Sequence, residues 1–259
     1  MYKKLITLLA LTAVLAILLT GCTITGTGGT NAVQGQGDMV TREIDVASFS
    51  GVNISGNFQV VYRQSPQWAL TAVMQENLFD YLQADASPGI LNVSTTRNMQ
   101  TTNANRPRLY VYAPYLTSAI LSGAVDALGW DKIEGENFEI SISGAADMNL
   151  VLDVERLTVD ASGAVNLDLE LTAQRAYFNL SGAADVNLEL TAGYLDVIAS
   201  GACEVNINGA ADTFDIRGSG AINLDARNLS FNSGRLGLSG ASNAYGKCGC
   251  KRIIPIRGA

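Results

Sequence analysis

The chain has 259 residues, enough for one large or two small domains with a substantial hydrophobic core. It contains no histidine, which excludes Ser-His-Asp and Cys-His catalysis, histidine acid–base chemistry and histidine-ligated zinc. Its 17 basic and 24 acidic residues give a net charge of −7 without a basic stripe, so nucleic acid is not an expected partner.

Residues 1–21 have the pattern of a secretory signal peptide. Lys3 and Lys4 form a positive segment, residues 5–19 are an almost unbroken apolar run, and the sequence Leu-Thr-Gly-Cys ends at Cys22. Small residues before a cysteine predict a bacterial lipoprotein that begins at a lipidated Cys22. We therefore expect an exported lipoprotein of the cell envelope, in the outer membrane because Thr23 is no acidic retention signal. The alternative is an uncleaved membrane anchor.

The domain organisation follows from the composition of the remaining segments. Residues 22–41 are mostly Thr, Gly, Gln and Asn, and predict a flexible tether after the lipidated cysteine. One domain is expected at residues 42–245. The basic segment at residues 246–259 is predicted to cap this domain or to form a frayed end. A short helical turn is predicted at residues 76–83. In the first part of the domain, the sequence predicts turns of the chain that are wider and less regular than those of the later repeats. Strands are predicted there at residues 42–64, 69–74, 90–95 and 108–113.

The triplet Ser-Gly-Ala occurs seven times, and its spacing is almost constant at 21, 19, 19, 19, 19 and 20 residues. A short, nearly fixed period is typical of stacked units that cannot bury their apolar side chains individually. We expect glycine at each repeat to form a corner, because glycine adopts backbone angles that a side chain forbids. The repeated serines are Ser122, Ser143, Ser162, Ser181, Ser200, Ser219 and Ser239.

Within each unit the apolar residues recur at every second position. Val186, Leu188 and Leu190 alternate with polar residues, and Asp196 falls on the outer side of the following run. Alternation over short runs predicts half-buried strands. Strands joined by glycine corners at about 19 residues per turn predict an all-β fold, a single-domain parallel β-solenoid or β-helix.

Two columns of polar residues are expected on the outer surface when the units are stacked. The first column takes the fourth residue after each repeated serine, and the second column takes the sixth. In each of five consecutive units, one of these two positions is an acid and the other is asparagine. The pairs are Asp147 and Asn149, Asn166 and Asp168, Asp185 and Asn187, Glu204 and Asn206, and Asn223 and Asp225.

These columns allow three interpretations. Stacked units lie about 4.8 Å apart, so carboxylates in line would repel, and an intervening asparagine amide could donate hydrogen bonds to them. This first interpretation is a structural polar ladder. The second is a calcium-binding face, because calcium prefers oxygen ligands. The third is a groove that binds or cleaves saccharides. No catalytic residue and no resident metal or cofactor is assigned.

The cysteines and outward tyrosines carry weaker signals. Cys203 occupies a position that is apolar in the other units, which predicts a small buried side chain. Cys248 and Cys250 could form a local disulfide or bind a soft metal with an outside partner. Tyr177 and Tyr194 lie in neighbouring units and could be either a packing pair or a platform for a sugar ring.

Several of these segments together resemble the head GIN domain family. They are the Phe-Ser-Gly-Val sequence that begins at Phe49, the Glu-Asn-Leu turn that begins at Glu76, the strand at residues 109–114 and the serial Ser-Gly-Ala corners. The resemblance covers about residues 42–245 and implies a right-handed, parallel β-helix-like fold on a secreted or lipid-anchored bacterial protein. The family is described as auto-transporter adhesins of unknown molecular function, and it supplies no catalytic residues to transfer.

The expected function is therefore that of a lipid-anchored cell-envelope module that binds, adheres or has a structural role, and not that of an enzyme. Its expected partners are the membrane, through the lipid anchor, and a polysaccharide or protein of the cell envelope. The alternative is a carbohydrate-active enzyme, or a calcium-dependent saccharide binder, that uses the two polar columns.

Overall fold

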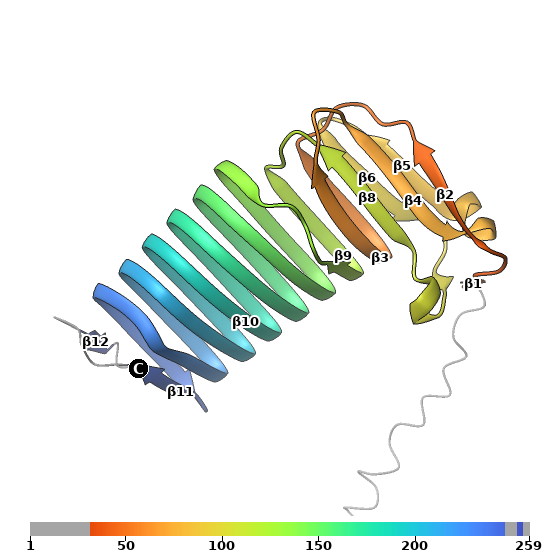
Figure 1. Cartoon of the computed structure of the whole chain (residues 1–259). Helices are drawn as coiled ribbons and strands as arrows, with labels where there is room; N and C mark the ends of the chain where they lie inside the picture. The colour runs from red at the N-terminus through yellow and green to blue at the C-terminus, as the bar shows by residue number, and fades with distance from the viewer. Residues whose placement is uncertain (1–31, 247–252, 256–259) are drawn as a thin grey trace, which may run out of the picture. The chain divides into compact units, whose positions relative to one another are not determined.

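The computed structural model describes residues 32–246 and 253–255. The predicted signal peptide, Cys22, Cys248 and Cys250 lie outside the described residues. The fold is all-β (Figure 1). Within the described part of the chain, helix is confined to two short 3-10 segments, η1 (Glu76–Tyr81) and η2 (Asn103–Asn105). The helical turn predicted at residues 76–83 is thus confirmed as η1. No helix in the described ranges is both long and apolar enough to span a membrane.

The N-terminal part of the domain combines parallel and antiparallel pairing. Strand β3 pairs in parallel with β6, β8 and β9 (Ser118–Ala127), whereas β4 runs antiparallel to both β2 and β8, and β5 runs antiparallel to β6. The prediction of wide windings throughout this region was therefore only partly right. Short Pro-containing connections at Pro66 and Pro88 separate strands that run in opposite directions. The strands are β1 (Val33–Gln34), β2 (Met39–Ile44), β3 (Gly51–Gln64), β4 (Ala69–Gln75), β5 (Leu82–Ala86), β6 (Ile90–Thr95), β7 (Met99–Gln100) and β8 (Arg108–Ala113).

The ordered domain begins before the boundary that the composition suggested. Strands β1 and β2 fall partly or wholly within residues 22–41, which were predicted to be a tether. Val33 packs against the hydrophobic core, and the side chain of Asn77 donates to the carbonyl of Gln34 at 2.9 Å and accepts from the amide of Gln36 at 2.8 Å. Partners distant in sequence therefore hold a segment whose own composition has little to bury.

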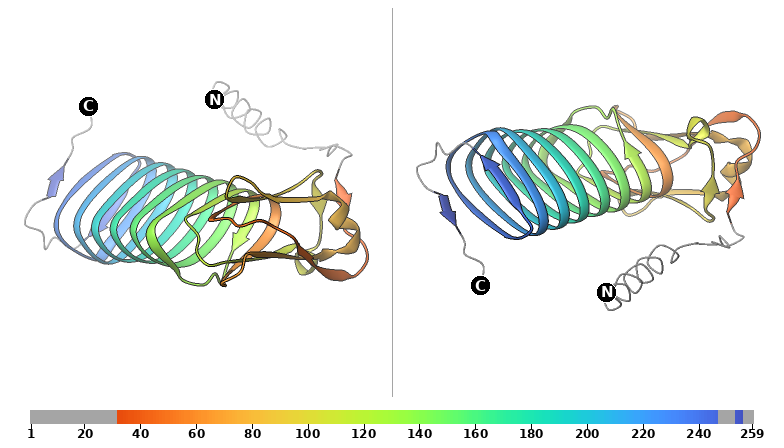
Figure 2. Two further views of the ribbon diagram at one scale, coloured as in Figure 1. Left: turned by 90° about the horizontal axis from the view of Figure 1, so that it is seen from above. Right: turned by 90° about the horizontal axis from the view of Figure 1, so that it is seen from below.

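The repeats form one continuous ribbon that winds around a hydrophobic interior (Figures 1 and 2). Strand β9 (Ser118–Ala127) pairs in parallel with both β3 and the start of β10 (Ile133–Gly240), which runs for 108 residues. Each winding lies beside the previous one, as side-chain hydrogen bonds between residues 19 apart show. Beyond β10, β11 (Asn243–Gly246) and β12 (Ile253–Pro255) each pair in parallel with it.

The glycine of each Ser-Gly-Ala triplet is required by both conformation and space. Gly163 has a φ of +111°, and a Cβ atom there would lie 2.1 Å from the carbonyl oxygen of Gly144 in the preceding winding. Ser162 secures the same corner, because its Oγ donates to the carbonyl of Ile142 at 3.2 Å. The predicted glycine corners are confirmed by positive φ at Gly123, Gly144, Gly163, Gly182, Gly201, Gly220 and Gly240.

The predicted inward residues form the core. Leu188 is 1% exposed, and Val186 and Leu190 are also buried. Cys203 is buried as expected, and burial raises the pKa of its thiol. Near the N-terminal end of the repeats, Trp130 packs against Tyr62 with a distance of 5.8 Å between the ring centroids. The indole N–H of Trp130 donates to the carbonyl of Val60 at 2.8 Å. This core holds successive windings together, so the outer side chains are placed in register.

Candidate functional site

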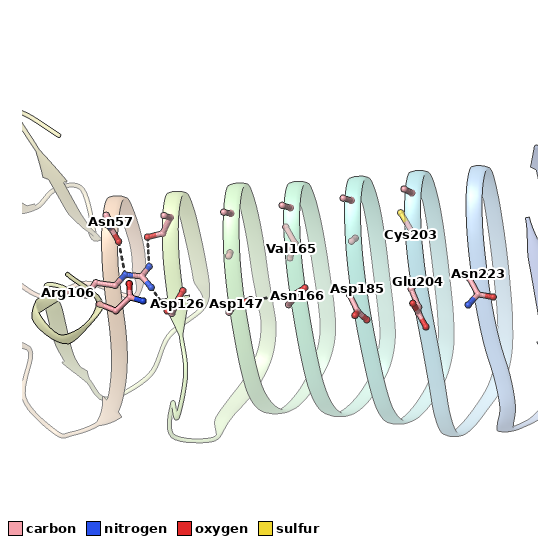
Figure 3. A pocket seen from close by; sticks show the side chains of 18 of the residues that line it. Asn57, Arg106, Asp126, Asp147, Val165, Asn166, Asp185, Cys203, Glu204 and Asn223 are labelled. Carbon is pink, nitrogen blue, oxygen red and sulfur yellow. Dashed lines mark hydrogen bonds and ion pairs between the residues drawn. The ribbon is translucent and has the colours of Figure 1, made fainter. Parts of the chain in front are cut away.

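The first polar column lies in line along the outside of the repeats (Figure 3), and the residues of the second column are exposed or half-buried. In the first column, Asn166 donates from Nδ2 to Oδ1 of Asp147 at 2.6 Å. In the second column, Asn187 donates to Asp168 at 2.8 Å and Asn206 donates to Asn187 at 2.9 Å. These contacts are the amide-to-oxygen hydrogen bonds that the ladder interpretation requires.

The ladder is not continuous. Asp225 instead pairs with Arg227 of its own strand, with 2.6 Å between Oδ2 and Nη2, and this hydrogen bonding lowers the pKa of Asp225. Asn149, Asp185, Glu204 and Asn223 make no side-chain hydrogen bonds with the described residues. Asp185 and Glu204 are exposed, so two carboxylates of the first column have acceptor capacity for an outside molecule.

The calcium-binding interpretation requires carboxylates that lie close together, and the part of the chain that the structure describes contains no such group. Within that part, no cluster of three or more His, Cys, Asp or Glu side chains is placed to hold a metal ion. Calcium takes six to eight oxygen ligands, which need to converge on one point. The columns instead distribute their carboxylates over successive windings.

A groove of about 780 Å³ runs along the first column and crosses several windings (Figure 3). The last residue of each Ser-Gly-Ala triplet contributes only a methyl group to this groove, which leaves space beside the polar side chains. The role of these alanines was not predicted from the sequence, although their repetition in every triplet was the available signal. The alanines that line the groove are Ala124, Ala145, Ala164, Ala183, Ala202 and Ala221.

Arg106, which precedes β8, lines the groove together with residues 101–103. Its guanidinium pairs with Asp126, its Nε donates to Oδ1 of Asn57 at 2.7 Å, and its Nη2 donates to the carbonyl of Ala124 at 2.9 Å. No sequence signal marked this arginine, because its partners lie 18 to 49 residues away.

The charge of the groove is unbalanced. Arg106 neutralises Asp126, whereas the three other acids that line the groove, Asp147, Asp185 and Glu204, have no basic partner among its lining residues. The groove is therefore negative along most of its length. This charge disfavours an anionic ligand and is compatible with a neutral or cationic one.

Tyr177 and Tyr194 contact each other on another part of the outer surface. Their ring centroids are 6.0 Å apart with a tilt of 59°, and the guanidinium of Arg156 lies 5.3 Å from the ring centroid of Tyr177. The two tyrosines thus pack against each other, and this packing does not exclude a platform role for Tyr194. Tyr194 is also part of a second cavity.

Replacing Asn166 with aspartate distinguishes a ladder from a cation site. The new carboxylate would lie between Asp147 and Asp185 on three successive windings, and the hydrogen bond to Asp147 would be lost. We expect a loss of roughly 1–2 kcal/mol in the free energy of unfolding, partly relieved by added salt. Thermal melts should show that calcium and chelator leave the wild type unchanged and that calcium stabilises only the variant. A calcium-induced rise in wild-type melting temperature that Asp185→Ala abolishes would contradict the ladder interpretation.

A family model described as "Putative auto-transporter adhesin, head GIN domain" matches residues 48–189 and 161–246 of the chain. The two matched segments overlap and together include every polar residue of both columns and all of the alanines in the groove. No curated protein sequence matches the chain.

Solved structures of bacterial proteins share the fold. A "putative adhesin" from Bacteroides fragilis NCTC 9343 aligns with a TM-score of 0.69 and 18% identity, over 86% of this chain and 100% of the other. A "putative lipid binding protein" from Parabacteroides distasonis ATCC 8503 aligns with a TM-score of 0.58 and 18% identity, over 83% of this chain and 99% of the other. A "putative adhesin" from Parabacteroides merdae ATCC 43184 aligns with a TM-score of 0.51 and 15% identity, over 88% of this chain and 100% of the other. At these identities the similarity shows the fold alone.

Proposed function

Because this chain belongs to the head GIN domain family of adhesin-like proteins, we propose that it is a lipid-anchored binding module of the bacterial cell envelope. In this proposal a right-handed parallel β-solenoid presents its outer surface to a ligand, and Cys22 carries the acyl chains. The continuous winding of β10 and the in-register parallel pairing of β3, β9 and β10 support the solenoid. The family and the structurally similar proteins are named for adhesion or binding and not for catalysis.

The groove along the first column is the proposed binding surface, and it is the observation that carries the proposal. Each winding contributes a similar set of groups, a methyl group and a polar side chain, at intervals of about 4.8 Å. An extended polymer that lies along the repeats would therefore meet the same chemistry several times. Repeated weak contacts of this kind add up in one long ligand.

We propose that this polymer is a neutral or amine-bearing polysaccharide. The exposed carboxylates of Asp185 and Glu204 can accept hydrogen bonds from sugar hydroxyl or ammonium groups. The alanine methyl groups leave space for sugar rings to approach the backbone. The net negative charge of the lining disfavours acidic polysaccharides.

Binding of the mature protein to a panel of neutral, amine-bearing and acidic polysaccharides tests this function. We expect binding to at least one neutral or amine-bearing glycan and weak binding to the acidic ones. Ala183→Trp, which fills the groove from an exposed position, should weaken the binding more than tenfold, about 1.4 kcal/mol or more. Ala47→Trp adds the same side chain at an exposed site outside the groove and should leave binding unchanged. Absence of binding to all of the glycans, or equal binding by the two variants, would reject the proposal.

The lipid anchor has a separate test. Replacing Cys22 with alanine removes the acylated residue, so the variant should remain an uncleaved precursor or be released as a soluble envelope protein. Membrane fractionation combined with mass spectrometry of the N-terminus measures both outcomes, and a conservative change at Thr23 is the matched control. Normal membrane retention together with a cleaved, unlipidated N-terminus in the wild type would disprove the anchor.

A further inference from the structure

A second cavity, of about 370 Å³, lies among three neighbouring windings and shares no residue with the groove. Tyr194, Thr213, Asp215, Ser233 and Arg235 contribute its polar groups. The backbone of Gly234 lies against the ring of Phe214, since a Cβ at this glycine would be 2.3 Å from that ring. Two aromatic rings, three hydroxyl groups, a carboxylate and a guanidinium therefore line one small space.

The aromatic side of this cavity is held in place by its neighbours. The hydroxyl of Tyr194 donates to Oδ2 of Asp196 at 3.3 Å, and its ring packs against Tyr177. Arg217 in turn donates from Nη2 to both carboxylate oxygens of Asp196 at 3.0 Å. Burial, followed by the charge of Asp196, raises the pKa of the Tyr194 hydroxyl. The ring is thus fixed before any ligand binds, which lowers the entropic cost of binding.

Asp215 has unused hydrogen-bonding capacity. Its Oδ1 is buried, lies 3.4 Å from Nε of Arg217 and accepts no hydrogen bond. Its Oδ2 is 4.0 Å from Nη1 of Arg235, beyond hydrogen-bonding distance, and accepts no hydrogen bond from the described residues. The Asp215 side chain is only 16% exposed, and its carboxylate is costly to leave in this state because its desolvation is not fully compensated.

Arg235 provides the complementary donor. Its side chain is 63% exposed, and its contact with Asp215 at 4.0 Å is too long for a hydrogen bond. An acceptor and a donor therefore lie close together at the cavity without bonding to each other directly. A ligand group that both donates and accepts, as a hydroxyl does, could bond to both.

We propose that this cavity binds one neutral saccharide unit. Tyr194 would contact the apolar C–H face of the sugar ring, Oδ2 of Asp215 would accept from a ring hydroxyl, and Arg235 would donate to a neighbouring oxygen. Asp196 and Asp215 are balanced by Arg217 and Arg235, so the local charge favours neither an anion nor a cation. The cavity volume is near the lower end for small-molecule sites, which fits a single sugar and not a chain.

Methyl glycosides test this site on the full-length protein purified in detergent. The panel contains the neutral methyl glucoside, galactoside, mannoside and N-acetylglucosaminide, with the charged glucuronide and glucosaminide for comparison. Saturation-transfer NMR and titration calorimetry should show saturable binding of at least one neutral glycoside with a millimolar dissociation constant. The charged members should bind no more tightly.

Two variants that alter the cavity in different ways test whether the glycoside binds there. Asp215→Ala removes the acceptor, and Ser233→Trp fills the cavity from an exposed position without changing the core. Each should weaken glycoside binding at least tenfold, whereas Ala47→Trp should bind as the wild type does. If Asp215→Ala does not fold, Ser233→Trp alone decides. No saturable binding of any neutral glycoside, tighter binding of a charged one, or unchanged binding by Ser233→Trp would overturn the proposal.

Discussion

A protein with aspartate in place of Leu188 is expected to lose several kcal/mol of its free energy of unfolding. Leu188 is 1% exposed and lies in the middle of the stack, where Leu169 and Ile207 occupy the corresponding positions of the adjoining windings. A carboxylate there would be buried without a cationic partner. Because each winding packs only on its neighbours, one disrupted winding should separate the stack into two parts.

Urea denaturation monitored by circular dichroism measures this loss. Glu189→Asp changes the exposed residue next in sequence and is the matched control, with an expected change below about 0.5 kcal/mol. Equal midpoints for the two variants would show that the assignment of inward and outward positions is wrong.

Gly163→Ala should also be strongly destabilising, although it adds only one methyl group. The added Cβ would lie 2.1 Å from the carbonyl oxygen of Gly144, and the backbone at Gly163 has a φ of +111°. Conformational strain of about 1–3 kcal/mol and a steric penalty of similar size together predict a loss of roughly 2–6 kcal/mol. Thermal and urea denaturation would measure this loss.

Gly135→Ala is the control for glycine replacement. A Cβ at Gly135 meets no atom within 4 Å, and its φ lies outside the positive range. This change should therefore alter stability by no more than about 0.5 kcal/mol, or stabilise the protein slightly by restricting the unfolded chain. A small effect of Gly163→Ala, comparable with that of Gly135→Ala, would contradict the close contact between successive corners.

Asp196 illustrates how far a sequence pattern extends. Alternation correctly placed it on the outer side of its strand, opposite the buried Leu195 and Val197. The pattern suggested a solvated side chain, yet the side chain of Asp196 is only 16% exposed because Arg217 and Tyr194 contact it. Arg217 is 21 residues away, so the contact depends on how one winding lies against the next.

The two polar columns likewise have features that the sequence predicts and features that depend on the tertiary structure. Their residues and register could be predicted because every unit repeats them at nearly the same spacing. Which amides donate to which oxygens could not be predicted, because this depends on side-chain orientation within each winding. Asn166 bonds to Asp147, but Asp225 turns to Arg227.

The sequence by itself determined the strands, the glycine corners and the buried side chains of the repeats. Each of these follows from local rules: alternation selects the inward face, and only glycine tolerates the stacked corner. The tertiary structure alone decided that β2, β4 and β5 pair antiparallel, that Arg106 lies beside Asp126 at the groove, and that Asp215 and Arg235 line one cavity. Apart from the β5–β6 pairing, these contacts join residues 20 or more positions apart, so they arise from chain reversals and from the stacking of windings, which no local pattern encodes.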